Sequence, residues 1–394
     1  MAISERARRL KPSSTLAITA KAKAMRAEGI DVIGFGAGEP DFDTPDHIKA
    51  AAIEAINSGF TKYTAASGIP ELKDAVAEKF KRDNGIEYAQ SEVTIGCGAK
   101  HIIYNIFQVV CDPGDEVLIP APFWVSYPEQ VRLANGTPKI IETTDFKMSA
   151  EQFEAAITPK TKMLVLNSPC NPTGAVYSRG ELEAIGEIAL KHRILILSDE
   201  CYEKILYDGN EHHSIGSFDK GLRELTLTVN AVSKTYSMTG WRIGYAGGPA
   251  DYIKAIGTIT SQSTSNPNSI AQKAAVAALE SDYALVEEIV EEFDKRRRIL
   301  VGALNECLKD DTPMPGGSFY YFPSISEFID KTVGSVVVRT ADDFCRILLE
   351  KARVAAVPGT DFGDSTRIRL SFATSEENIR EGMRRIAECV GEAS

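Results

Sequence analysis

Short apolar runs alternate with longer segments of helical period along much of the chain. Segments such as KHIIYNIFQVV and RGELEAIGEIALKH repeat apolar residues every three to four positions, as helices that cover a sheet do. The runs between them are typical of buried strands: VTI (93–95), EVLI (116–119), KMLVLN (162–167), RILILS (193–198), LTLTVN (225–230) and RIGYAGG (242–248). This alternation predicts an α/β fold with crossover helices around the sheet.

The pattern changes after about residue 282. The segment 283–308 predicts one long helix, and the remainder mixes short strands with two helices, the last of them EENIREGMRRIAECV. We expect an N-terminal arm over 1–47 that belongs partly to a small domain, a large α/β domain over 48–285, and a smaller α+β domain over 286–394. The long helix would connect the two domains.

Composition and charge exclude several classes of protein. The 394 residues include 44 basic and 55 acidic ones, and the basic residues are dispersed rather than gathered in a stripe, so nucleic acid is not an expected partner. No apolar run reaches the roughly 18 residues of a membrane span. The N-terminal segment is basic but has no apolar centre, so we interpret it as part of the mature protein.

The cysteines and histidines give no sign of a metal site or a disulfide framework. The seven cysteines are odd in number and widely spaced, without any C-x-x-C pair. His212 and His213 lie in a polar stretch without the spacing of metal ligands. We therefore predict reduced, structural thiols and a cytoplasmic protein.

The stretch NAVSKTYSMTGWRIGYAGG places Lys234 directly after a predicted buried strand, among small hydroxyl residues and glycines. Ligands of open α/β sheets bind beyond the carboxyl ends of the strands, so this loop is a candidate site. The local context leaves two alternatives open, a reactive lysine and the commoner solvated surface lysine.

NAVSKTYSMTGWRIGY resembles the cofactor-lysine signature of the class I aminotransferases, the fold-type I enzymes that use pyridoxal 5'-phosphate (PLP). The resemblance implies a fold-type I PLP-dependent transferase, with a large domain built on a mostly parallel sheet and a smaller α+β domain. It extends over nearly the whole chain, because further segments resemble those of the family in the family's order: AGEPDFDTP, KYTAASGIPELKDAV, APFWVSYPE, NSPCNPTGAVY, SDECYEKILY, VPGTDF and RIRLSFATSEENI.

The resemblance assigns the chemistry to three residues. Lys234 would hold PLP covalently and later move a proton between the substrate α-carbon and the cofactor. Asp199, at the end of RILILSD, would keep the pyridine nitrogen protonated, so that the ring can accept electrons. Tyr202 would donate a hydrogen bond to the phenolic oxygen. A helix cap remains an alternative for Asp199, and packing for Tyr202.

A phosphate site is expected where a helix follows the strand VTIG. Gly98, Ala99 and Lys100 open this helix, and the backbone N–H groups of a helix start can bind an anion. A helix start without any ligand is the alternative. The resemblance adds two side chains that bind the phosphate, those of Ser233 and Arg242, the latter as a bidentate fork.

Three further residues match the family at the cofactor. Trp124 would stack on the pyridine ring, although core packing is the usual place of a tryptophan. Asn171, in N-P-T-G, would share the phenolic oxygen and meet the substrate carboxylate, and otherwise marks only a turn. Tyr63 would reach the phosphate from the neighbouring subunit, which implies a homodimer with shared active sites.

The substrate contacts are also taken from the resemblance. Arg369 would clamp the α-carboxylate, although Arg367 is two residues away on the same predicted strand face and is not wholly excluded. The backbone of Gly38 would approach the substrate. Lys100 and Thr15, in KPSST, match positions that contact the distal carboxylate in one bacterial subgroup of aspartate aminotransferases. Lys100 could equally be a solvated lysine.

The predicted reaction is transfer of the amino group of aspartate to 2-oxoglutarate by a ping-pong mechanism, with amino acids and 2-oxo acids as the small-molecule partners. Three alternatives stay open: an aspartate or glutamate aminotransferase that acts on prephenate, a PLP-dependent carbon–sulfur lyase, and a PLP-binding module without activity. We expect neither a nucleic acid nor a membrane as partner.

Overall fold

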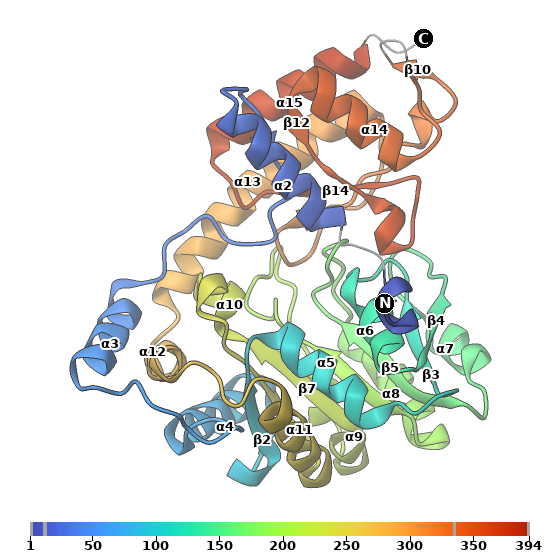
Figure 1. Ribbon diagram of the computed structural model, residues 1–394. Helices are drawn as coiled ribbons and strands as arrows, with labels where there is room; N and C mark the ends of the chain where they lie inside the picture. The colour runs from blue at the N-terminus through green and yellow to red at the C-terminus, as the bar shows by residue number, and fades with distance from the viewer. Residues whose placement is uncertain (1–2, 11–13, 334–335, 392–394) are drawn as a thin grey trace.

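A computed structural model describes residues 3–10, 14–333 and 336–391 (Figure 1). Its main sheet has seven strands in the order β2-β8-β7-β6-β5-β3-β4. Neighbouring strands are parallel, except that β8 is antiparallel to both β7 and β2. The strands are β2 (Val93–Gly96), β3 (Glu116–Pro120), β4 (Thr137–Ile141), β5 (Thr161–Asn167), β6 (Leu195–Asp199), β7 (Thr226–Ala231) and β8 (Gly244–Gly247).

Helices cover both faces of this sheet. Val117 and Ile119 of β3 pack in one apolar cluster with α5 and α11, while Leu118 between them packs in another with α7 and α8. Successive side chains of a strand point to opposite faces, so a sheet covered on both sides needs continuous apolar runs. The helices around it are α3 (Asp46–Asn57), α4 (Pro70–Asn84), α5 (Ala99–Val110), α6 (Ser126–Leu133), α7 (Ala150–Ala156), α8 (Arg179–His192), α9 (Lys220–Leu225), α10 (Val232–Thr235), α11 (Ala250–Ser263) and α12 (Ser269–Glu280).

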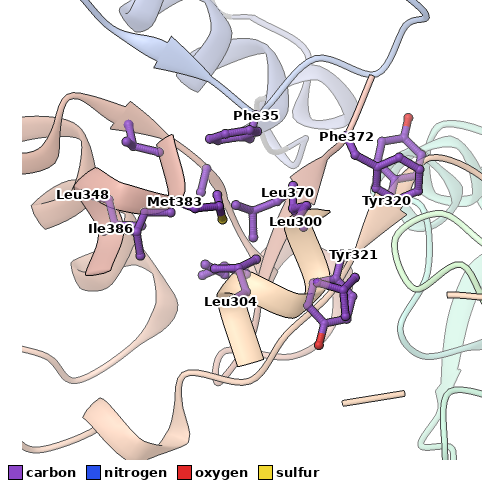
Figure 2. Packing of buried hydrophobic residues seen from close by; sticks show 14 of the residues in the cluster. Phe35, Leu300, Leu304, Tyr320, Tyr321, Leu348, Leu370, Phe372, Met383 and Ile386 are labelled. Carbon is purple, nitrogen blue, oxygen red and sulfur yellow. The ribbon is translucent and has the colours of Figure 1, made fainter. Parts of the chain in front are cut away.

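The C-terminal third forms a smaller unit, and α13 (Ala284–Leu308) runs from the large sheet into it (Figure 1). Leu300 and Leu304 of α13 pack against Met383 and Ile386 of α15 (Glu376–Gly391), with Phe35 in the same cluster (Figure 2). The other elements here are α14 (Ala341–Ile347), η5 (Leu348–Ala352), the antiparallel sheet of β13 (Val357–Pro358), β14 (Ile368–Ser371) and β9 (Tyr320–Tyr321), the parallel pair β1 (Ile33–Gly34) and β12 (Val354–Ala355), and the antiparallel pair β10 (Thr332–Val333) and β11 (Val336–Val337).

Residues from the N-terminal part of the chain also lie against the smaller unit. Helix α2 (Ser14–Ala27) contacts β12 and β13, and β1 pairs with β12. A separate short helix, α1 (Glu5–Arg8), precedes it, and residues 11–13 between them lie outside the described part. The remaining short helical turns are η1 (Gln90–Glu92), η2 (Ile215–Ser217), η3 (Thr239–Trp241), η4 (Ser326–Phe328) and η6 (Gly359–Phe362).

The sequence predictions for the main sheet are confirmed with one omission. All six predicted strands and the four named helices are present, with ends shifted by a residue or two. The pattern missed β4, whose sequence TPKII is partly exposed and contains a proline, so it is no buried apolar run. The seven cysteines all lie within the described residues, and the structure places none of them in a disulfide bond. No helix among the described residues is long and apolar enough to cross a membrane. The domain boundaries remain a prediction.

Candidate active site

The carboxyl ends of the central strands meet at one edge of the sheet. Asn167 at the end of β5 pairs in register with Asp199 at the end of β6, and β7 leads directly into α10, which carries Lys234. A cavity of about 510 Å³ lies at this edge. The predicted residues that line it are Thr15, Gly38, Ala99, Lys100, Trp124, Asn171, Asp199, Tyr202, Ser233, Lys234, Arg242 and Arg369.

Two predicted residues do not line the cavity. Gly98 lies just behind it, as the residue that precedes α5, with a φ of +85°. This positive φ favours glycine, and a Cβ on Gly98 would also lie 2.6 Å from Nη2 of Arg242 and would displace this guanidinium. Tyr63 is 89% exposed on the surface of the chain. This exposure leaves its predicted role at the site of a neighbouring subunit open.

Lys234 is held in a partly buried position. Its Nζ donates a hydrogen bond to the backbone carbonyl of Gly38. Burial lowers the pKa of the Lys234 ammonium to about 8, since the charged form loses solvation. More of this amine is therefore neutral near pH 7 than of an exposed lysine, and the neutral form is the one that attacks a carbonyl group.

Asp199 is buried, and its two oxygens each accept one hydrogen bond. The Tyr127 hydroxyl donates to Oδ2 at 2.7 Å, and the Cys201 backbone N–H donates to Oδ1 at 3.2 Å. Burial raises the pKa of the Asp199 carboxyl, although both hydrogen bonds favour its charged form. The described residues provide no salt bridge to this carboxylate. A carboxylate in such surroundings is stabilised by a cationic ligand atom, and a protonated pyridine nitrogen is one.

Positive charge gathers where α5 begins. The Arg242 guanidinium donates to the backbone carbonyls of Thr239 at 2.9 Å and Cys97 at 3.4 Å, and no carboxylate of the described residues pairs with it. Burial, and then the charge of Arg242, lower the pKa of the Lys100 ammonium. Ser233 lines the same cavity as Arg242. These donors, together with the N–H groups of the helix start, suit a phosphate group.

Trp124 provides a flat wall for the cavity. Its ring packs edge to face on Tyr127, with the ring centroids 5.2 Å apart. Nζ of Lys100 lies 4.9 Å from the centroid of the Trp124 ring, a cation–π distance. The ammonium group of Lys100 therefore lies beside the surface on which a pyridine ring would stack.

The structure distinguishes the two candidate arginines. Arg369 on β14 is 2% exposed and donates to Oδ1 of Asn171 and to the Gly36 carbonyl, each at 3.0 Å. Its Nε has no hydrogen-bond partner, and no carboxylate of the described residues pairs with it. Arg367 instead forms an ion pair with Asp364 at 3.3 Å. Arg369 is therefore a buried cation at the cavity wall, and Arg367 has a structural partner.

If Arg369 holds the substrate α-carboxylate, as the resemblance implies, we expect Arg369→Ala to lower kcat/KM for every amino acid by about two to four decades, because two charge-assisted hydrogen bonds would be lost. Arg367→Ala is the matched control, since it removes an arginine two residues away that binds Asp364. It should lower the melting temperature and leave KM near the wild-type value. Steady-state kinetics with aspartate, alanine and phenylalanine, beside thermal melts, test both. Equal kinetic losses in the two variants would contradict the assignment.

Two tyrosines of the site were missed by the sequence analysis. Tyr127 binds Asp199, and the hydroxyl of Tyr320 lies 2.9 Å from the hydroxyl of Tyr202. Both are almost fully buried and line the cavity. Tyr127 lies in the quoted segment APFWVSYPE, but a tyrosine in a sequence gives no sign of whether its hydroxyl meets a functional group or only packs.

A second polar cluster lies behind Asp199. Glu200, Glu203 and His212 place ligand atoms within 4.8 Å of one another, although the sequence around His212 has no ligand-like spacing. Asn84 donates to Glu200 at 2.8 Å and to Glu203 at 2.7 Å, and Lys79 forms an ion pair with Glu203. The carboxylates are thus already matched by protein donors, and we interpret the cluster as a structural network.

Comparisons with known proteins agree over the full length of the chain. The family model described as aminotransferase class I and II matches residues 30–386, which include every cavity residue described above except Thr15. An aspartate aminotransferase of Bacillus sp. (strain YM-2) is 50% identical over 387 residues and 98% of each chain. An aspartate/prephenate aminotransferase of Cereibacter sphaeroides is 51% identical over 395 residues and 99% of each chain. The crystal structure of the aspartate aminotransferase from Rhizobium meliloti aligns over 100% of both chains with a TM-score of 0.96 and 45% identity.

Proposed function

The chain belongs to the family of class I and II aminotransferases, and on this basis we propose that it transfers the amino group of L-aspartate to 2-oxoglutarate. The products are oxaloacetate and L-glutamate, formed in two half-reactions of a ping-pong mechanism. The family uses PLP, which when bound supplies an electron sink for the α-carbon of the substrate.

The observation that supports this most directly is the placement of Lys234, Asp199 and Arg369 around one cavity. The amine of Lys234, with its pKa near 8, can bind the cofactor and move a proton at the substrate α-carbon. The buried carboxylate of Asp199 suits the ring nitrogen. The buried guanidinium of Arg369, which has no carboxylate partner among the described residues, suits the substrate α-carboxylate and would orient the α-carbon toward Lys234.

The other cavity residues would hold the cofactor in the same orientation. The start of α5 with Ser233 and Arg242 suits the phosphate, and Trp124 suits the ring face. Tyr202 and Asn171 also line the cavity and would meet the phenolic oxygen. The cavity therefore has donors for the phosphate and the phenolic oxygen of PLP, and an acceptor, Asp199, for its ring nitrogen.

The preference for a dicarboxylic substrate rests on Lys100 and Thr15. Both line the cavity, and the ammonium group of Lys100 lies beside Trp124. A positive charge and a hydroxyl in a partly buried wall favour a second carboxylate on the substrate. Relatives of high identity are named aspartate aminotransferase and aspartate/prephenate aminotransferase, so prephenate, another dicarboxylate, is the second candidate acceptor.

An acceptor panel at fixed aspartate tests the reaction and the substrate together. The purified enzyme with PLP is assayed with 2-oxoglutarate, prephenate, pyruvate and phenylpyruvate, and the amino acid products are quantified. We expect the highest kcat/KM with a dicarboxylic acceptor. Pyruvate released from a cysteine derivative without any acceptor would instead indicate a carbon–sulfur lyase. Equal rates with all four acceptors would contradict the dicarboxylate preference.

The role of Lys100 can be tested by its effect on different substrates. Lys100→Ala should lower kcat/KM for aspartate and glutamate by about one to two decades more than for alanine or phenylalanine, because only dicarboxylic substrates lose a charge-assisted hydrogen bond. The neutral substrates serve as the internal control for folding and cofactor binding. Equal losses in both substrate classes would show that Lys100 supports the phosphate site or the helix start instead.

The assembly and location are part of this proposal. We propose a homodimer in which Tyr63, 89% exposed in a single chain, reaches the phosphate site of the neighbouring subunit. A monomer measured by light scattering at micromolar concentration would contradict this. We also propose a cytoplasmic location, where thiols stay reduced, in keeping with the absence of a disulfide bond among the described cysteines.

A further inference from the structure

Tyr320 lies close to three parts of the site: Tyr202, Arg369 and the backbone of Gly38. It lies on β9, which pairs with β14, so that Tyr320 is opposite Ser371 and Tyr321 is opposite Leu370. Neighbouring residues of a strand point to opposite faces. Figure 2 shows the result: the hydroxyl groups of Tyr320 and Tyr321 point in opposite directions, and only Tyr320 lines the cavity.

The Tyr320 side chain makes three contacts there. Its hydroxyl lies 2.9 Å from the hydroxyl of Tyr202, which follows β6 of the large sheet. The Arg369 guanidinium packs over its ring, with Cζ 4.4 Å from the centroid. A Cβ added to Gly38 would lie 3.0 Å from the Tyr320 hydroxyl, so the Gly38 backbone is close to it as well. One side chain therefore contacts residues that we assign to the cofactor and to the substrate.

We propose that Tyr320 is a positioning residue. Its hydroxyl donates a hydrogen bond to the Tyr202 hydroxyl, so that the Tyr202 hydroxyl donates its own hydrogen bond to the phenolic oxygen of the bound cofactor. This inference rests on the proposed role of Tyr202. Either hydroxyl can be the donor within the tyrosine pair. Each hydroxyl has a single proton, so when Tyr202 donates to the cofactor, the proton between the two tyrosines comes from Tyr320.

The arrangement strengthens the Tyr202 donor in two ways. A hydroxyl that accepts a hydrogen bond becomes a better donor, so the Tyr320 contact strengthens the bond from Tyr202 to an anionic oxygen. Both side chains are at least 95% buried, at 5% exposure for Tyr202 and 1% for Tyr320, so water does not compete for the bond. The phenolic oxygen therefore carries its negative charge more easily when both tyrosines are present.

This stabilisation has a spectroscopic consequence. The bound cofactor changes its visible absorbance when it loses the proton that its phenolic oxygen shares with the nitrogen of Lys234. Hydrogen-bond donors to that oxygen make the shared proton more acidic. The loss of a donor therefore moves the midpoint of the absorbance change to higher pH. The other titratable groups around the tyrosine pair are Arg369, Glu39 and Cys201, and the substitutions below leave all of them in place.

The experiment compares pH titrations of the visible absorbance for the wild-type holoenzyme, Tyr320→Phe and Tyr202→Phe. We expect the midpoint of Tyr320→Phe to lie about half a pH unit above that of the wild type, and that of Tyr202→Phe to lie higher still. The double variant should match Tyr202→Phe, because Tyr320 acts through Tyr202. For Tyr320→Phe we expect kcat to fall roughly two- to tenfold with KM unchanged, because phenylalanine keeps the ring under Arg369.

Tyr321→Phe is the matched control. Its hydroxyl binds Asn305 at 2.7 Å and the Thr312 carbonyl at 3.1 Å, on the other side of the strand. This variant should melt at a lower temperature and keep the wild-type midpoint. A wild-type midpoint in Tyr320→Phe, with a shifted one in Tyr202→Phe, would overturn the inference while keeping the proposed role of Tyr202. A wild-type midpoint in Tyr202→Phe would overturn both.

Discussion

Lys234→Ala should lose transamination activity by about 10⁴-fold or more, since the change removes both the amine that binds the cofactor and the group that moves a proton at the α-carbon. The geometry supports a single lysine in both tasks. Lys234 follows β7 at the edge where Asp199 ends β6, and its Nζ is held by the Gly38 carbonyl. Borohydride reduction of the wild-type holoenzyme, followed by peptide mapping, should find the cofactor on Lys234.

Lys234→Arg is the informative control, because it keeps the positive charge and cannot form the covalent bond. It should be as inactive as Lys234→Ala if the amine itself is required. The wild-type amine should bind the cofactor faster as the pH rises through about 8, where burial places its pKa, and the rate should level off above it. Label on another lysine, or a variant with near-normal turnover, would contradict the assignment.

The sequence predicted the sheet where its local pattern reflects burial. Strands β3, β5, β6 and β7 are covered on both faces, so their apolar runs are continuous and easy to detect. The antiparallel direction of β8 leaves no trace in RIGYAGG, because the direction depends on the connection and not on the residues of the strand. Strand β4 was missed since it lies at the edge of the sheet, where exposed positions are tolerated.

The residues of the candidate site also divide into those that could be predicted from the sequence and those that could not. Lys234, Asp199 and Arg369 carry groups whose chemistry the family resemblance assigns, and the structure brings them to one cavity. Tyr127 and Tyr320 could not be predicted in this way. Their roles depend on where their hydroxyls end in the fold, and Tyr320 comes from the smaller unit, 118 residues along the chain from Tyr202. A local sequence pattern cannot predict a contact between two residues that lie so far apart in the chain.

The choice between the neighbouring arginines illustrates the same point. A strand with period two places Arg367 and Arg369 on one face, so the pattern alone left both open. In the structure β14 begins at Ile368, and Arg367 lies just before it, where Asp364 and Thr312 bind its guanidinium. The difference arises from the end of the strand and from loop residues that no periodicity describes.

Asp199→Ala should lower kcat by about 10³-fold or more while the cofactor stays attached to Lys234, because a preorganised charge that stabilises the transition state is commonly worth this much. The buried carboxylate has no cationic partner among the described residues, so its charge is available to the pyridine nitrogen. Without this carboxylate the ring nitrogen loses its proton more easily, and the ring accepts electrons from the α-carbon less well.

Three substitutions, to alanine, asparagine and glutamate, separate the effect of the Asp199 charge from the effect of its hydrogen bonds and position. Asp199→Asn keeps an oxygen that can accept the hydrogen bond from Tyr127 but removes the charge, and it should be nearly as slow as Asp199→Ala. Asp199→Glu keeps the charge at a shifted position and should be faster than both. Single-turnover measurements of the half-reaction with aspartate isolate the proton-transfer step, and the visible absorbance reports the bound cofactor. Near-normal turnover of Asp199→Asn would show that the carboxylate acts through its hydrogen bonds alone.

The pH dependence of cofactor binding gives an independent check. Burial raises the pKa of the Asp199 carboxyl, so without the cofactor this group takes up a proton more readily than an exposed aspartate does. A cationic ring nitrogen beside it would favour the charged carboxylate and so lower this pKa. Binding of PLP and loss of the Asp199 proton are therefore linked, and the cofactor should bind more weakly as the pH falls and the carboxyl becomes protonated. Asp199→Asn has no such proton to lose, so its acid dependence should be flatter than that of the wild type. Parallel curves for the two proteins would contradict a charge pair between Asp199 and the ring.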